Sequence, residues 1–510
     1  MKSKSNYSET IVEVFVGKHE KVIILIFCLA ALVRIFLFSC AFPFFNNVDE
    51  QAHFDTVVKY ARGYLPRKGD NYFHREAAGF IAVYKSPEYL ADFTELESEG
   101  ELQPLWLIRD EEATAYIIQK TATWMTRKNH EAYSPPVYYA SAGVWYNLGK
   151  ALGLEGGHLL YWIRFLNVGI YGLLLLFSYW FCRALYKDNL FLRIGVPLLL
   201  IFFPQDVFYA INSDVFSPLL FLVALYFLIQ IHDTERTFLF YLVTGLMIAA
   251  AFLTKFSNVC LLVVFFLFLF SIIKKSHAAG RLRKRGANLF VLVLTAAVPI
   301  TLWLGWNAYA LGDITGSAEK LEALHWKVKP LIKMGDHPLF TGGGAIYFLT
   351  DLIKTFWRGE LVWRAKTLAW AGTDLFFVIS SGIFVLAAMI GPLLCKNSCP
   401  AGHRRLNYIN MFVLCLFVLF LGVLSVMYDF ADSWYPSQES PYFTSGRLIS
   451  GALIPFVILY LDGLGFLASR ISRRISPLAV VFFIAVFIAG AEIYLTYEVF
   501  ASPFNWFHMF

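Results

Sequence analysis

The sequence predicts an all-α polytopic membrane protein, and three observations support that fold class. Hydrophobic residues fill 58% of the 510 positions and aromatic residues 18%, whereas only 16% are charged. A soluble protein of this length would carry charges at about a quarter of its positions. Several apolar runs reach about 20 residues, the length that crosses the hydrocarbon core of a bilayer.

The apolar runs predict about eleven transmembrane helices in one domain, residues 21–510. The first run is too long for the apolar core of a signal peptide and lacks a small-residue cleavage site, so we expect a retained signal anchor. It carries Arg34, which we expect to pair with an acidic residue inside the bundle. The spans are expected near residues 21–42, 159–182, 190–211, 213–231, 237–254, 257–273, 288–311, 374–394, 406–428, 447–468 and 477–498.

Lysine and arginine residues set the expected orientation, because basic loops remain cytoplasmic. They predict a cytoplasmic N-terminus (1–20), an exterior C-terminus and two long outer loops, 43–157 and 312–373. The net charge of +6 is concentrated in the basic loops and therefore does not predict a nucleic-acid partner. The outer loops contain no Asn-x-Ser/Thr sequon, which fits a bacterial inner membrane. The basic segments are 2–18, 183–193, 274–285, 396–405 and 470–474.

An acidic pair, Asp49-Glu50, lies where the first span leaves the membrane, with His53 close behind. Ionisable groups at a bilayer boundary are costly and usually functional. We expect a helix over residues 49–62, in which Asn47 and Glu50 form a capping box. On that helix Asp49, Glu50 and His53 lie three or four residues apart and share one side. The alternative is that Asp49 merely caps the helix.

Several short motifs follow one another in a characteristic order along most of the chain. They are Arg34, Val48-Asp-Glu-Gln-Ala-His53, Tyr60-Ala-Arg-Gly63, Ser134-Pro-Pro-Val-Tyr-Tyr139, Arg164, Asn212-Ser-Asp214 and Ser445-Gly-Arg447. This order resembles the membrane glycosyltransferases of the GT-C class, including protein O-mannosyltransferases, lipid A aminoarabinose transferases and bacterial relatives without assigned substrates. The resemblance implies a GT-C-like bundle with juxtamembrane helices in the first outer loop.

The resemblance also implies a reaction in which a sugar moves from a polyprenyl-phosphate donor to a hydroxyl of a glycan, lipid or protein acceptor. A carboxylate within hydrogen-bond reach can act as the base for that hydroxyl, and Asp49 is the expected base. Glu50 and His53 would orient the acceptor or the base. Alternatively, Asp49, Glu50 and His53 would hold a divalent cation. Metal use varies within the class, so both possibilities stay open.

The departing lipid phosphate requires a guanidinium or ammonium group. Lys255, Arg358 and Arg447 are candidates because each is expected at an outer membrane edge. The alternative for Lys255 is that its side chain extends to the membrane–water interface without binding substrate. The alternative for Asp214 is that it caps the helix that it begins. The full set of expected substrate-binding residues is His53, Arg62, Tyr138, Asp214, Lys255, Arg358 and Arg447.

Three other functions are considered. A lipid-linked polysaccharide polymerase or ligase would grip a diphosphate with basic residues and would not need Asp49-Glu50. A transporter or flippase would carry charged or helix-breaking residues near the middle of several spans, together with inverted repeats, and no repeat is apparent. A non-catalytic scaffold would leave the acidic pair without a role. The sequence therefore favours the glycosyltransferase.

Overall fold

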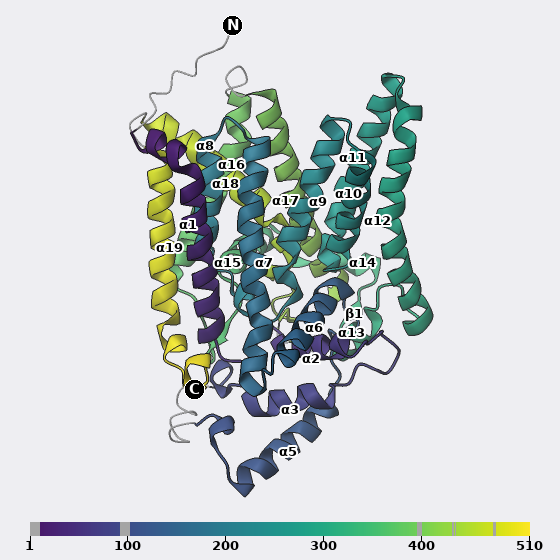
Figure 1. Ribbon diagram of the computed structural model, residues 1–510, viewed down its shortest axis with the longest axis vertical. Coiled ribbons are helices and arrows are strands. Elements are labelled where there is room, and N and C mark those ends of the chain that lie inside the picture. The colour runs from purple at the N-terminus through teal and green to yellow at the C-terminus, as the bar shows by residue number, and fades with distance from the viewer. Residues whose placement is uncertain are drawn as a thin grey trace.

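The computed structural model describes residues 11–91, 103–394, 400–430, 433, 435–472 and 476–509. Long helices lie side by side along one direction, and shorter helices gather at one end of the bundle, which is the lower end in Figure 1. We call this the loop end. The first ten residues of the predicted cytoplasmic N-terminus lie outside the described residues, as do parts of two predicted basic loops, 396–399 and 473–474.

Within the described residues, nine helices are long and apolar enough to cross a membrane, as expected for a polytopic membrane protein. The apolar helices α8 (Leu190–Ile201) and α10 (Phe238–Phe252) coincide with two further predicted spans. At 1.5 Å per residue they are only about 18 and 23 Å long, so the count of eleven stays a prediction. The nine are α1 (Ile11–Ala41), α7 (Gly156–Leu185), α9 (Ser217–Asp233), α11 (Val259–Ala278), α12 (Leu282–Leu311), α16 (Ala371–Leu394), α17 (Ala401–Met427), α18 (Leu453–Ile471) and α19 (Pro477–Phe500).

Glycines let neighbouring helices of the bundle approach closely. A methyl group on Gly245 of α10 would overlap the Leu292 carbonyl of α12, and one on Gly463 of α18 would overlap the Phe384 carbonyl of α16. Both helix pairs are in contact. Small residues at such interfaces allow membrane helices to gain packing energy where no hydrophobic driving force exists between them.

Arg34 pairs with an acidic residue inside the bundle, as the sequence predicts. Its guanidinium Nε lies 3.0 Å from Glu492 Oε2 of α19, and both side chains are less than a tenth exposed. The Tyr209 hydroxyl and the Phe203 carbonyl accept further hydrogen bonds from the same guanidinium. A buried charge requires such a set of partners, so Arg34 has a structural role.

The first long loop folds into four helices at the loop end, and the second folds partly beside the spanning helices (Figure 1). The described elements of the first loop are α2 (Glu50–Ala61), α3 (Arg75–Tyr84), η1 (Pro87–Tyr89), η2 (Leu105–Leu107), α5 (Glu111–Met125) and α6 (Pro136–Ala151). Those of the second are α13 (Ala318–Ala323), β1 (Lys327–Val328), α14 (Leu331–Met334), η6 (Pro338–Phe340), α15 (Gly342–Arg358), β2 (Val362–Trp363) and β3 (Lys366–Thr367). In Figure 1, α14 and α15 lie level with the lower halves of the spanning helices, above α2 and α3.

Two short antiparallel ribbons order the second loop. β2 pairs with β3, and β1 pairs with β4 (Tyr428–Asp429), which follows α17. Five short 3-10 turns complete the described elements: η3 (Asp206–Tyr209), η4 (Ser213–Val215), η5 (Phe256–Asn258), η7 (Gly446–Ala452) and η8 (Trp506–His508). The described parts of both long loops lie toward the same end of the bundle (Figure 1). That this end faces the cell exterior stays a prediction.

Candidate active site

The acidic pair begins a helix, as predicted, but Asp49 does not cap it. α2 starts at Glu50, and the Asp49 side chain makes no capping hydrogen bond. The predicted capping box is also wrong, because the Asn47 side chain instead donates to the Glu360 carbonyl and accepts from the Val362 backbone N–H. The Asp49 backbone is left-handed, with φ of 64°. Such a conformation costs energy outside glycine, although aspartate tolerates it better than most residues.

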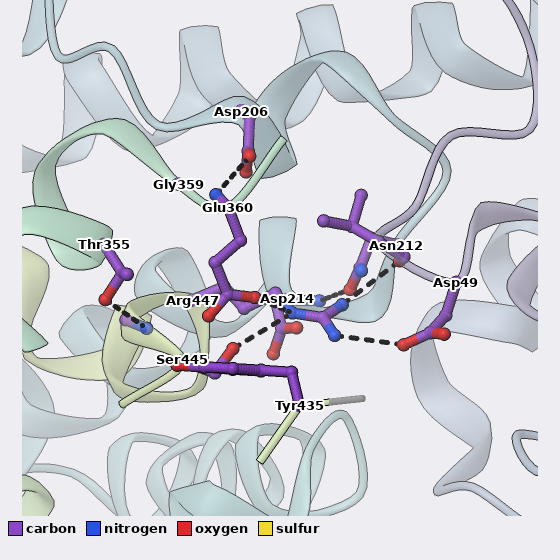
Figure 2. Close-up of polar contacts among 12 residues, drawn as sticks. Asp49, Asp206, Asn212, Asp214, Thr355, Gly359, Glu360, Tyr435, Ser445 and Arg447 are labelled. Atoms are coloured by element: carbon purple, nitrogen blue, oxygen red, sulfur yellow. Dashed lines mark hydrogen bonds and ion pairs between the residues drawn. The ribbon is translucent and has the colours of Figure 1, made fainter. Parts of the chain in front are cut away.

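This backbone turn directs the Asp49 carboxylate toward an arginine and a histidine from distant parts of the chain. Its Oδ2 lies 3.1 Å from Arg447 Nη2 (Figure 2), and its Oδ1 lies 3.5 Å from His130 Nε2. Burial alone would raise the pKa of Asp49, but the hydrogen bond and charge of His130, together with the Arg447 guanidinium, hold it well below its usual value. The side chain is still 34% exposed, so it can meet a ligand.

Arg447 is fixed by the turn that begins α18. Its guanidinium donates to the Val48 carbonyl at 3.2 Å and to Ser445 Oγ at 3.3 Å, and it lies 3.6 Å from Glu360 Oε2. A methyl group on the preceding residue, Gly446, would overlap the backbone of Phe356 in α15. The glycine therefore lets the Arg447 turn pack directly against α15, which carries Glu360 just beyond its end.

The loop after α15 is held in place by a buried carboxylate. Asp206 Oδ2 accepts from the backbone N–H groups of Glu360 (2.7 Å) and Leu361 (2.9 Å) (Figure 2). Gly359 has φ of 85°, and a methyl group there would overlap the Asp206 carboxylate. Burial raises the pKa of Glu360 to about 7, although the Arg447 charge and the Ser445 hydroxyl oppose the shift. Strongly shifted carboxyls of this kind gather at functional sites.

A second ion pair lies close to the first. Lys255, at the junction of α10 and α11, lies 3.1 Å from the buried Asp214 Oδ2, and its side chain is 15% exposed. Asp214 lies beside Arg447 in Figure 2. The Tyr138 hydroxyl of α6 accepts the Asn212 backbone N–H at 3.1 Å and is fully buried, so it supports the turn that carries Asp214.

Glu50 and His53 have partners of their own, away from the Arg447 guanidinium. The fully buried Glu50 carboxylate forms a two-point pair with Arg164 of α7 (2.6 and 2.7 Å). It also accepts from the backbone N–H groups of Phe45 and Ile211. These contacts give Glu50 a structural position that ties α2 to α7.

His53 is buried in α2, and its Nδ1 lies 2.7 Å from the Tyr139 hydroxyl. Burial lowers the pKa of His53 to about 3, with the charges of Lys255 and Arg447 adding to the shift and the Glu131 carboxylate opposing it. At neutral pH the imidazole is therefore uncharged and acts as a hydrogen-bond partner of Tyr139.

The residues proposed for a metal do not form a metal group. Asp49, Glu50 and His53 each contact a different partner, and the part of the chain that the structure describes contains no group of three or more His, Cys, Asp or Glu side chains placed to hold an ion. Carboxylate and imidazole ligands bind divalent cations only when several converge.

Two predicted substrate residues lie apart from the Asp49–Arg447 pair. Arg62 is 54% exposed and pairs with Glu76 of α3 at 2.6 Å. Arg358 pairs with Asp374 at the start of α16 at 2.8 Å and is largely buried. The structure brings together Asp49, Asp214, Lys255 and Arg447 from the predicted set.

Three site residues, His130, Asp206 and Glu360, are missing from the sequence-based set. His130 lies before α6 in a polar segment, and its contact with Asp49 is what assigns it to the site. Asp206 and Glu360 come from loops 154 positions apart and meet through a backbone hydrogen bond. The sole sequence signal is the Arg358-Gly-Glu360 end of α15, where a glycine permits the turn that aims Glu360 at Arg447.

Comparison with known proteins places the chain in a group without an assigned function. Residues 32–437 match the family described as "Predicted membrane protein (DUF2142)". A search of curated proteins finds no match. Among solved structures, the chain is similar to the Archaeoglobus fulgidus oligosaccharyltransferase, crystallised with zinc and sulfate, at 14% identity and a TM-score of 0.33. That similarity covers 72% of this chain and 44% of the oligosaccharyltransferase.

Proposed function

The chain belongs to the DUF2142 family of predicted membrane proteins, and we propose that it is a membrane glycosyltransferase. In this proposal a sugar moves from a polyprenyl-phosphate donor to an acceptor hydroxyl at the loop end. The loop end faces the exterior of a bacterial inner membrane, since the basic α11–α12 turn, with Arg281 and Lys284, lies at the opposite end of the bundle. The single domain of residues 21–510 is proposed to carry the whole activity.

The observation that carries this proposal is the ion pair between Asp49 and Arg447. A partly exposed carboxylate and a guanidinium meet 3.1 Å apart, beside a second cation, Lys255, where two of the spanning helices end. Transfer from a lipid phosphate requires these groups: a base for the acceptor and cations for the phosphate. The lipid tail of the donor requires them at a membrane boundary.

The reaction is a displacement at the anomeric carbon of the donor sugar. The acceptor oxygen forms a bond to that carbon as its O–H bond breaks, and the proton moves to the Asp49 carboxylate. The bond from the anomeric carbon to the phosphate oxygen breaks, and its electron pair leaves with the phosphate. Arg447 and Lys255 stabilise the added negative charge. A phosphate leaving group is stable as an anion, so no strong general acid is required.

Donor binding rearranges the charges around Arg447. Without a donor, Asp49 and Glu360 neutralise its guanidinium. A phosphate that binds Arg447 draws the guanidinium away from Asp49. Loss of the Arg447 charge raises the pKa of Asp49, although the His130 contact still lowers it, so the carboxylate becomes a better proton acceptor than in the donor-free state. The donor therefore helps to activate the base.

The test uses cells in which the Asp49→Asn variant is the sole source of the protein. Mass spectrometry of the envelope glycans is the measurement. We expect the modification to disappear while the protein is produced and folded, because an amide keeps the size and backbone tolerance of aspartate but accepts no proton. Asp70→Asn, a change of the same kind at an exposed position of the same loop, is the matched control. Full glycan modification with Asp49→Asn would refute the assignment of the base.

A further inference from the structure

A segment of the second long loop exposes neighbouring apolar side chains. Leu331 and Ile332 of α14 are 85% and 86% exposed, and Phe340 and Ile346 are 66% and 67% exposed. Leaving side chains of this size in water is unfavourable relative to burying them. Contiguous exposed apolar surface marks contact with a membrane or a protein.

The height of α14 in the bundle identifies what covers this surface. In Figure 1, α14 lies above the point where α12 ends, level with the lower halves of the spanning helices. At that level, surface that the protein itself does not cover faces lipid. α14 therefore lies where acyl chains of the nearer leaflet would surround it.

A cavity of about 220 Å³ opens beside this apolar surface. Its lining comes from the second long loop around α14 and η6, and from four residues that follow α17: Asp429, Phe430, Gln438 and Pro441. His337 closes one side, since its Nδ1 accepts the Leu339 N–H and its Nε2 donates to the Pro441 carbonyl. The charged side chains of the lining are Lys329, Lys333, Asp336 and Asp429.

Both signs of charge line the cavity in equal number. Lys329 is partly buried, and burial lowers its pKa while the Asp429 carboxylate opposes the shift, which places these two groups close together. Asp336 and Asp429 would repel a purely anionic ligand. A ligand with both an ammonium and a phosphate group would satisfy both lysines and both carboxylates.

We propose that this cavity binds a phospholipid of the bilayer whose headgroup carries an amine and a phosphate. The phosphate contacts Lys329 and Lys333, the ammonium contacts Asp336 and Asp429, and the acyl chains lie along Leu331 and Ile332. The site is separate from the Asp49–Arg447 pair and does not depend on the proposed transferase activity. It makes α14 a membrane-inserted segment.

The binding test uses native mass spectrometry of the full-length protein with phosphatidylethanolamine or phosphatidylglycerol. We expect retention of phosphatidylethanolamine, about tenfold weaker in the double variant Lys329→Gln/Lys333→Gln, because the charge-assisted contacts to the phosphate are lost. Asp336→Asn should abolish the preference for the amine lipid while phosphatidylglycerol still binds. Lys366→Gln, an exposed lysine of β3 outside the cavity, is the control and should change nothing.

Three outcomes would overturn the proposal. Equal retention of both lipids by the wild type would show that the headgroup is not recognised. Unchanged retention in the double variant would place the lipid elsewhere. Displacement of the lipid by soluble phosphoethanolamine alone would show that acyl chains contribute nothing.

Depth of insertion provides an independent test that does not require lipid selectivity. A fluorophore on Leu331→Cys in nanodiscs should be quenched by doxyl-labelled lipid and protected from aqueous iodide. The control is Leu107→Cys, at an exposed position in η2 of the first loop, which should show the opposite pattern. Quenching of both positions by iodide would refute membrane insertion of α14.

Discussion

Replacing Arg447 by glutamine tests the phosphate-binding half of the proposed site. The guanidinium is 14% exposed and contacts Asp49, Glu360, Ser445 and the Val48 carbonyl. A charge-assisted hydrogen bond to a phosphate contributes about 1.5–3 kcal/mol, so its loss should weaken polyprenyl-phosphate binding about 10- to 100-fold. Lys255 remains in the variant, which is why we expect weakening rather than complete loss.

The same change has a cost for folding. It leaves the Asp49 carboxylate with His130 but without the guanidinium, and it removes the cation beside Glu360. Breaking a fully buried pair costs about 3–5 kcal/mol, and the one-third exposure of Asp49 reduces this to about 2 kcal/mol. A thermal melt in detergent, run beside the binding assay, separates this loss of stability from the loss of affinity.

The binding assay is titration of undecaprenyl phosphate into the purified protein, followed by native mass spectrometry. Arg447→Lys serves as the graded control, because a lysine keeps the charge but cannot reproduce the planar fork of contacts. Its affinity should lie between those of the wild type and the glutamine variant. Equal affinity of wild type and Arg447→Gln, with both folded, would refute the assigned phosphate contact.

Three further predictions concern the residues that hold the site. Glu50→Gln should prevent stable folding rather than give a folded inactive protein. It leaves Arg164 buried without a countercharge, which costs about 3–5 kcal/mol. The yield of folded protein in size-exclusion chromatography measures this effect. Gly359→Ala should lower the free energy of unfolding by about 1–3 kcal/mol, because it strains the backbone and displaces the Asp206 carboxylate. A lower melting temperature would show this. Glu360→Gln should flatten the pH dependence of stability between pH 5 and 8.

The sign of that pH dependence follows from the raised pKa of Glu360. Its carboxyl binds a proton more tightly in the folded state, at a pKa of about 7, than at its ordinary value of 4.5. The stabilisation that the protonated Glu360 provides is therefore fully present below about pH 4.5. It is lost as the pH rises through 7, and the free energy of unfolding falls by up to about 3 kcal/mol. Melting curves at pH 5, 6.5 and 8 measure it. An equal slope in wild type and Glu360→Gln would contradict the assignment.

Much of the helical architecture could be predicted because apolar run length and loop charge act locally. Each predicted span coincides with a helix, although α8 and α10 are short. The acidic pair was also detectable, since charges at the end of the first span stand out. The end of the predicted span 190–211 was not predictable, because α8 ends at Ile201 and is followed by the η3 and η4 turns, which hold Asp206 and Asp214.

The division of roles within the acidic pair could not be read from the sequence. Adjacent residues at a helix start point in different directions, and the left-handed backbone of Asp49 turns its carboxylate toward Arg447 while Glu50 meets Arg164. The Asp49–Arg447 contact joins residues 398 positions apart, and no local pattern encodes such a pairing. His130 and Glu360 were missed for the same reason.

The β1–β4 ribbon has a mechanical consequence. Lys327 pairs with Asp429 and Val328 with Tyr428, so the backbone before α14 is fastened to the segment that leads to Arg447. The Trp326 indole adds a hydrogen bond to Ser433 on the same segment. The ribbon therefore couples any displacement of α14 to β4 and Ser433. If α14 inserts into the leaflet as we propose, bilayer thickness acts on the same part of the chain that leads to Arg447.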